Sequence, residues 1–237
     1  MLTVEDRPFL TAQWRHLAMV NYEVDPELVG PLVPRGTELD HFGGRYYVSL
    51  VGLLFLHVRL RGLRIPFHER FEEINLRFYV RRRVGAETRR AVVFVRELVR
   101  LPTVALIARW RYGEHYSALP MRHRVDERNA SYEWRRGGRW QGLRVEAEEG
   151  AALPRPGSEE EFITEHYWGY STTRRGTIEY RVEHPRWRVR RARASVDGDL
   201  ERLYGPGFAA TLSRPPTSAF LADGSSVAVM PGRLLRS

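Results

Sequence analysis

The chemistry with the clearest pattern in this sequence lies in one row of polar residues, Glu73, Asn75, Arg77 and Tyr79. Apolar residues alternate with them, and this period of two is typical of a strand with two unlike faces. A carboxylate, an amide, a guanidinium and a phenol in a row form a polar site if their face lines the inside of a closed barrel. In an open sheet the same face meets water, and the sequence is compatible with both arrangements.

Glu73 is the catalytic candidate of this row. Its neighbour Glu72 points to the opposite face of a strand, so the two carboxylates cannot act as a pair on one substrate. A glutamate held against Arg77 in an apolar interior can work as a general base, or it can simply anchor the guanidinium in a structural ion pair. The pattern fits both roles.

A second concentration of reactive side chains lies in the segment 165–170, where we take Glu165, His166 and Tyr170 as candidate ligand-binding residues. Adjacent Glu and His residues do not share a helix face, so their spacing is not that of a metal site. The aromatic residues of this segment fit a lid over a core equally well. The chain carries no nucleophile elbow, phosphate loop or dinucleotide fingerprint, and we expect neither a metal nor a cofactor.

Composition excludes two classes of chemistry. The chain has no cysteine, so it has no disulfides, thiolate nucleophiles or cysteine-ligated metals. It also has no lysine, and all 38 basic residues are arginines. Because arginine stays protonated, no side chain here can form a Schiff base with a carbonyl substrate.

The formal net charge of +9 raises the question of a polyanionic partner. The densest basic run, residues 186–193, is typical of a strand with Arg186, Arg188 and Arg190 on one face. No nucleic-acid-binding motif accompanies it, and that face has no aromatic residue to stack on bases. A solvated strand face is the favoured interpretation, and binding to nucleic acid or another polyanion through this strand is the alternative.

Hydrophobic periodicity predicts a mainly β (α+β) chain with a few short helices. Helices are expected after the N-caps Asp25 and Ser158 and before Gly205. We expect one domain over residues 1–237, with mostly antiparallel strands in a curled or closed sheet. The expected strands are 14–22, 45–55, 71–80, 91–99, 105–112, 132–136, 139–145, 177–183, 186–193 and 218–229.

Six runs of the sequence closely resemble one known family. They are NYEVDPELVGPLVPRGTELD, RYYVSLVG, FEEINLRFYV, RELVRLP, EEFITEHYWGY and EYRVEHPRW. Together they cover nearly the whole chain, and the family they resemble is the uncharacterised bacterial family called domain of unknown function 2071, the YqjF-like proteins. That family has no established activity, so the resemblance implies a scaffold rather than a reaction.

A more distant similarity connects the chain to the acetoacetate decarboxylases, whose fold is a β-barrel or cone with peripheral helices. The shared elements are Val-Pro at 33–34, Glu-Leu-Asp at 38–40, Arg-Glu-Leu at 96–98 and a proline at 102. In those enzymes two lysines follow, one forming the Schiff base and the other lowering its pKa. Here Thr103 and Val104 stand in their place, so the resemblance implies the fold, while lysine-dependent decarboxylation is predicted to be absent.

The same similarity indicates further candidates by spacing. Glu73 matches the carboxylate that faces the lysine in those enzymes, while Tyr47 falls near a second carboxylate and Trp14 near the substrate-binding arginine. The leading hypothesis is therefore a protein that binds a small polar or carboxylate-bearing molecule inside a barrel. The expected polar contacts are Glu73, Asn75, Arg77 and Thr103, and the expected walls are Trp14 and Tyr47.

The alternative is an enzyme that works without an imine, namely a hydrolase, isomerase or lyase with Glu73 as general acid or base. The start of the chain has early acids and no apolar run, and the longest apolar stretch, 48–58, is too short to cross a bilayer. We therefore expect a soluble, cytoplasmic protein with a small-molecule ligand and no membrane partner. A homo-oligomer is compatible with the sequence.

Overall fold

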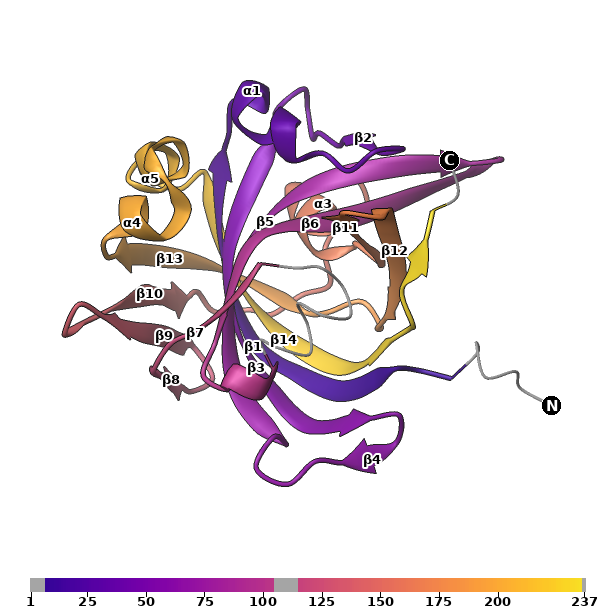
Figure 1. Ribbon diagram of the computed structural model, residues 1–237. Coiled ribbons are helices and arrows are strands. Elements are labelled where there is room, and N and C mark those ends of the chain that lie inside the picture. The colour runs from indigo at the N-terminus through magenta and orange to yellow at the C-terminus, as the bar shows by residue number, and fades with distance from the viewer. Residues whose placement is uncertain (1–6, 105–114, 236–237) are drawn as a thin grey trace.

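The computed structural model describes residues 7–104 and 115–235, and strands prevail over short helices in them (Figure 1). The strands are β1 Leu10–Glu23, β2 Glu38–Leu39, β3 Tyr47–Leu60, β4 Leu63–Arg64, β5 Arg70–Val84, β6 Glu87–Val99, β7 Tyr116–Ala118, β8 Met121–Val125, β9 Asn129–Arg136, β10 Arg139–Ala147, β11 Trp168–Thr173, β12 Gly176–Glu183, β13 Val189–Asp197, β14 Ser218–Val229 and β15 Arg233–Leu234. The helices are α1 Pro26–Val29, the 3-10 helix η2 Gly30–Leu32, α3 Glu159–Thr164, α4 Leu200–Tyr204 and α5 Pro206–Leu212.

Within the described residues, seven strands form a closed ring in the order β12, β11, β6, β5, β3, β1 and β14. The ring closes because β12 pairs back onto β14, where Val182 lies opposite Val229. Neighbours in the ring are antiparallel apart from β11, which runs parallel to β6 at Trp168. The mainly β architecture with short outer helices, expected from the sequence, is confirmed.

A second group of strands branches from β14 and covers the outside of the ring (Figure 1). Here β13, β10, β9 and β8 follow one another and face β1, β3 and β5. The two layers meet closely at Gly52, where even a methyl group would overlap the ring of Tyr132. The core between them contains Leu50, Leu76 and Trp134, so the central strands of the ring are buried on both faces. This double burial accounts for the nearly continuous apolar run of β3.

The two faces of β5 therefore enter two different interiors. Its apolar residues, Ile74, Leu76, Phe78 and Val80, belong to the core between the layers. Its polar residues, Glu73, Asn75, Arg77 and Tyr79, face the inside of the ring, and each is at most 9% exposed. The tertiary structure thus decides the question that the alternation left open, because a closed ring keeps the polar face away from solvent.

The predicted N-caps are present at two helices, and Gly205 ends the helix α4 as predicted. Asp25 accepts a hydrogen bond from the backbone N–H of Glu27 at 2.9 Å, with proline at the next position. Ser158 accepts from the N–H of Glu161 at 3.2 Å, and the Glu161 carboxylate accepts from the N–H of Gly157 at 2.7 Å. The helix after Ser158 ends at Thr164, and the chain then leads through Glu165 into β11.

The structure corrects several predicted boundaries. The basic strand predicted at 186–193 begins at Val189. Arg186 lies before the strand, and its guanidinium donates to the carbonyl of Pro154 at 2.8 Å. Strands β8 and β11 and helix α5 were not expected from the sequence. The predicted strand 105–112 lies outside the described residues. Every helix in the described ranges is too short or too polar to span a membrane.

Candidate ligand-binding cavity

The ring of strands encloses a cavity of about 160 Å³. Its walls are mostly aromatic and aliphatic, and polar side chains enter it from β5, β6 and the segment that follows α3. The large rings in the wall include Trp14, Phe55, Phe71, Phe94, Trp168 and Trp187. The polar residues used below are Glu73, Asn75, Arg77, Glu97, Thr164 and His166. A largely apolar cavity with a few converging polar groups is the usual form of a small-molecule site.

Glu73 is buried in this cavity, with 4% of its surface exposed. Its carboxylate accepts hydrogen bonds from the Asn75 amide at 3.0 Å and from the Tyr116 hydroxyl at 3.3 Å. Burial raises the pKa of Glu73 to about 7, against the opposing effect of these two hydrogen bonds and of the nearby positive charge of Arg77. The carboxyl group therefore exists in both protonation states near neutral pH.

Arg77 is a buried cation that forms no ion pair with the described residues, although the partly protonated Glu73 carboxyl lies nearby. Its guanidinium donates to the carbonyl of Ile163 at 3.3 Å and lies 5.7 Å from the ring centre of Tyr79. Its Nε atom is buried and makes no hydrogen bond, and no carboxylate of residues 7–104 or 115–235 forms an ion pair with it. Because a buried charge is costly unless it is paired, the site favours an anion beside Arg77.

His166 lies next to these residues and is 7% exposed. Its ring packs against Tyr79 at 4.6 Å and against Phe162 at 5.6 Å between ring centres. Burial, together with the positive charges of Arg90 and Arg77, holds the pKa of His166 well below its usual value, so the imidazole is neutral. Neither ring nitrogen of His166 makes a hydrogen bond of ordinary geometry to the described residues. The same is true of the side-chain amide oxygen of Asn75, Oδ1.

Five of the residues proposed from the sequence come together in this cavity: Trp14, Glu73, Asn75, Arg77 and His166. They originate from β1, β5 and the segment after α3, which the closed ring brings to one interior. Trp14 packs edge-on against Phe55 and Trp187 in the wall, as an apolar surface.

Four of the proposed residues do not line this cavity, and for Tyr47 and Thr103 this corrects the expected position inside the barrel. Tyr47 is buried beneath α3, where its hydroxyl donates to Glu159 at 3.5 Å. Thr103 is exposed and contacts the cavity only through its hydrogen bond with His68. Tyr170 points away from the cavity, because β11 turns this side chain towards Glu179, to which its hydroxyl donates at 2.6 Å.

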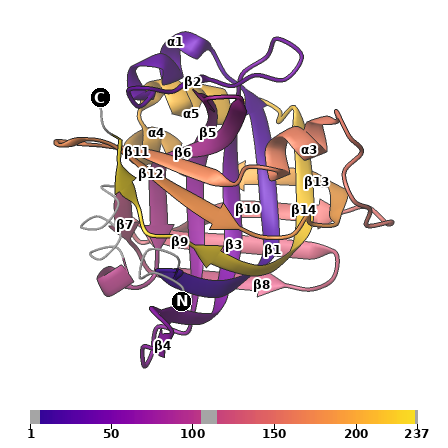
Figure 2. The same ribbon diagram turned by 90° about the vertical axis from the view of Figure 1, so that its right-hand side faces the viewer.

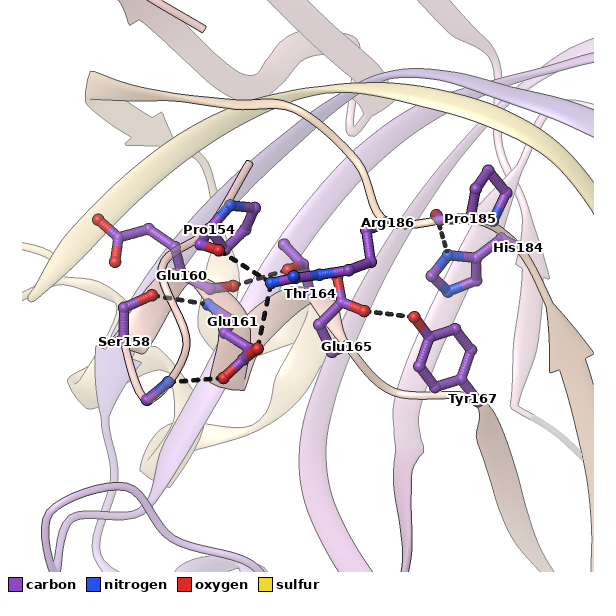
Figure 3. Close-up of polar contacts among 11 residues, drawn as sticks. Pro154, Ser158, Glu160, Glu161, Thr164, Glu165, Tyr167, His184, Pro185 and Arg186 are labelled. Atoms are coloured by element: carbon purple, nitrogen blue, oxygen red, sulfur yellow. Dashed lines mark hydrogen bonds and ion pairs between the residues drawn. The ribbon is translucent and has the colours of Figure 1, made fainter. Parts of the chain in front are cut away.

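Glu165 is the fourth. Figure 3 shows its carboxylate between Arg186 and the hydroxyl of Tyr167. Arg186 also reaches Glu161, at 3.1 Å, so it ties α3 to the segment that leads into β13. The side chains of the adjacent residues Glu165 and His166, just after α3, point in different directions. His166 lines the cavity, while Glu165 faces this ion-pair network.

Sequence reasoning missed Glu97, Tyr116 and Thr164 as cavity residues. Glu97 lies opposite Asn75 in the pairing of β5 with β6 and is 1% exposed. A signal existed for it, because Glu97 interrupts an otherwise apolar strand face and falls within a motif shared with the acetoacetate decarboxylases. Tyr116 and Thr164 gave no such signal, since they lie in the short strand β7 and at the end of the short helix α3, which only the fold brings to the ring.

Comparison with known families and proteins agrees with this architecture. The chain matches the model of DUF2071, described as an uncharacterized conserved protein, over residues 11–226. It is 32% identical over 81 residues to uncharacterized protein YqjF of Bacillus subtilis strain 168, a match that covers 33% of this chain and 34% of that protein. The chain thus aligns with about a third of the length of this curated relative.

Solved structures show the same fold at low sequence identity. Acetoacetate decarboxylase from Legionella pneumophila superposes with a TM-score of 0.69 at 10% identity, covering 99% of this chain and 90% of that one. The enduracididine biosynthesis enzyme MppR, complexed with pyruvate, gives 0.67 at 14% identity, covering 100% and 92%. An acetoacetate decarboxylase-like enzyme from Sphingomonas wittichii RW1 gives 0.60 at 12% identity, covering 96% and 93%.

Proposed function

The chain belongs to the family of uncharacterised conserved proteins called domain of unknown function 2071, and on this premise we propose that it binds a small molecule with a carboxylate group and an apolar body inside the ring of strands. The acetoacetate decarboxylase-like fold supplies the chamber. The chain contains no lysine, so a Schiff base on a side chain is not part of the proposal.

One observation carries the proposal, namely the buried guanidinium of Arg77 without a counter-ion among the described residues. A ligand carboxylate beside its free Nε would supply both the missing charge and the missing hydrogen-bond acceptor. Two other partly buried arginines already have such a partner, since Arg82 and Arg89 both bind Glu179.

The rest of the cavity supports the same ligand. The aromatic walls favour an apolar body, while neutral His166 and protonated Glu73 can each donate a hydrogen bond to a polar atom of the ligand. A ligand carboxylate near Glu73 would favour its protonated state, since two like charges in one cavity are costly. MppR, which shares the fold, is complexed with a small carboxylate, pyruvate.

Matched probes test the role of Arg77. We expect benzoate to raise the melting temperature of the protein and benzamide, its uncharged analogue of similar size, to raise it much less. In Arg77→Met the difference between the two probes should vanish, because the side-chain volume stays similar while the charge is lost. Native mass spectrometry of the protein as purified should also reveal a retained acid in the parent and none in Arg77→Met.

Arg83→Met serves as the control, because Arg83 is an exposed arginine on the same strand. It should leave the preference for benzoate unchanged. Equal shifts with benzoate and benzamide, or an unchanged preference in Arg77→Met, would contradict the proposal.

The raised pKa of Glu73 favours a second candidate function, an enzyme in which Glu73 acts as general acid or base on the bound molecule. A carboxyl group with a pKa of about 7 can both take up and release a proton near neutral pH. Glu73→Gln separates the two functions. If the parent converts the retained molecule, and Glu73→Gln still binds it but no longer converts it, the protein is an enzyme. If the parent binds the molecule and leaves it unchanged, the protein is a binding protein.

A further inference from the structure

The most exposed large apolar side chains in the described residues lie in one hairpin. This hairpin, residues 59–70, connects β3 to β5 and includes β4. Phe67 is 93% exposed and Leu63 is 72% exposed. Figures 1 and 2 show that β4 projects beyond the ring, at the end of the molecule opposite α1. Exposed apolar groups gathered on a projecting element mark an interaction surface.

The hairpin is also strongly basic. It contains one acidic residue, Glu69, and four arginines, Arg59, Arg61, Arg64 and Arg70. The first three of these arginines form no ion pair with any residue that the structure describes. The exposed apolar side chains are thus bordered by cations that no described carboxylate neutralises.

The backbone holds the tip of the hairpin in a defined turn. Phe67 has a φ of 65°, a conformation that bulky residues rarely adopt. The N–H of His68 donates to the carbonyl of Ile65 at 3.0 Å, and the His68 ring binds both the carbonyl of Pro66 and the hydroxyl of Thr103. Phe67 is therefore presented to the outside by an ordered turn.

The inner side of the same hairpin borders the cavity. Ile65 and His68 line it, although both lie within four residues of exposed Phe67 or Leu63. The surface that carries the apolar tip is thus continuous with the wall of the candidate ligand site.

We propose that this hairpin docks the protein onto an anionic lipid bilayer. Leu63 and Phe67 would enter the interface between headgroups and acyl chains, while Arg61, Arg64 and Arg59 bind lipid phosphates. A second copy of the chain is a poorer occupant, because a twofold contact through this hairpin would set the same unpaired arginines against one another. Docking in this way brings the cavity wall to the lipid surface and does not depend on which ligand the cavity holds.

Vesicle co-sedimentation of the full chain tests the proposal. Vesicles of phosphatidylcholine mixed with phosphatidylglycerol should bind the protein about tenfold more tightly than vesicles of phosphatidylcholine alone. Leu63→Ser with Phe67→Ser, and separately Arg61→Ser with Arg64→Ser, should each weaken binding to the anionic vesicles by about tenfold. Added salt should weaken the binding of the parent.

Two control variants remove the same groups elsewhere. Leu153→Ser with Leu234→Ser replaces leucines that are 54% and 49% exposed. Arg174→Ser with Arg175→Ser removes two exposed arginines from the turn between β11 and β12 and changes the net charge equally. Both controls should bind anionic vesicles as the parent does.

Three results would overturn the proposal. They are equal binding of the parent to neutral and anionic vesicles, equal losses in the hairpin and control variants, and a dimer in sedimentation velocity that only the hairpin variants dissociate. The last result would assign the hairpin to a second copy of the chain. Because the substituted side chains are exposed, an unchanged melting temperature will show that each variant is folded.

Discussion

Glu72 and Glu73 are neighbours in β5, are both almost fully buried, and yet lie in differently built interiors. Glu72 lies 2.6 Å from Nδ1 of His123 and 3.4 Å from the guanidinium of Arg100. Arg70 approaches the other nitrogen of His123 at 3.3 Å, and since arginine only donates, Nε2 is the acceptor there and the proton on Nδ1 faces Glu72. Among the residues that the structure describes, Glu73 receives hydrogen bonds from two uncharged groups, the Asn75 amide and the Tyr116 hydroxyl.

The difference shows two solutions to one physical problem. A carboxylate taken out of water must be paired or must hold its proton. Outside the ring Glu72 is paired with basic side chains, whereas inside the ring Glu73 has a pKa raised to about 7. The same contrast extends to Arg77, which forms no ion pair with any described carboxylate. The inner face therefore leaves hydrogen-bonding and charge capacity for a ligand, whereas Glu72 on the outer face is already ion-paired.

The largest expected effect is the difference in stability between two substitutions at neighbouring positions, one on each face of β5. Leu76 is fully buried between the layers, so Leu76→Ala should lower the free energy of unfolding by about 2–5 kcal/mol. Arg77→Met should instead raise it by about 1 kcal/mol, because it removes an unpaired buried charge. Chemical denaturation of both variants measures the contrast. A loss in Arg77→Met as large as that in Leu76→Ala would mean that the inner face is built for stability alone.

The next effect concerns pH. The native pKa of Glu73, about 7, lies above the ordinary value of 4.5, so between these pH values the folded protein holds a proton that the unfolded chain releases. Its contribution to stability is complete below pH 4.5 and is lost as the pH rises through about 7, a decline of about 3 kcal/mol in the free energy of unfolding. Glu73→Gln should remove this decline. Urea denaturation across this range, parent against variant, provides the measurement, and identical slopes would refute the raised pKa.

A smaller change in the free energy of unfolding, of opposite sign, is expected at the neighbouring residue Glu72. At about pH 8, Glu72→Gln should lower the free energy of unfolding by about 1–2 kcal/mol, since it takes the charge from the partners His123 and Arg100. Arg100 is 50% exposed, and solvent screening limits its share of the loss. Glu73→Gln at the same pH should stabilise the protein. If both substitutions shift stability in the same direction, the distinction between the two interiors fails.

Local patterns were sufficient for much of this fold. The alternation of β5, the capping residues Asp25 and Ser158, and the two strands expected at 132–136 and 139–145, which are β9 and β10, are all present as predicted, because each depends on a few adjacent residues. The short strand β11 was missed because its aromatic residues follow directly on a helix pattern, and tertiary pairing with β12 and β6 overrides that pattern.

The candidate site was predicted where one strand carries it and missed where several elements do. Three of its polar residues are spaced by two in β5, so a single face contains them. Tyr47 has the type expected of a cavity wall, but α3 covers it, and no local pattern reports that contact. Tyr116 enters the site through a hydrogen bond to Glu73, 43 positions away in sequence.

The sequence by itself determined which side chains share a face of β5, and it excluded imine and thiol chemistry, because strand periodicity and composition are properties of the chain alone. Only the tertiary structure decided that the polar face is enclosed, since the closing pair β12–β14 joins residues far apart in sequence. That closure removes water from Glu73 and Arg77, and the loss of water gives both groups their unusual electrostatics.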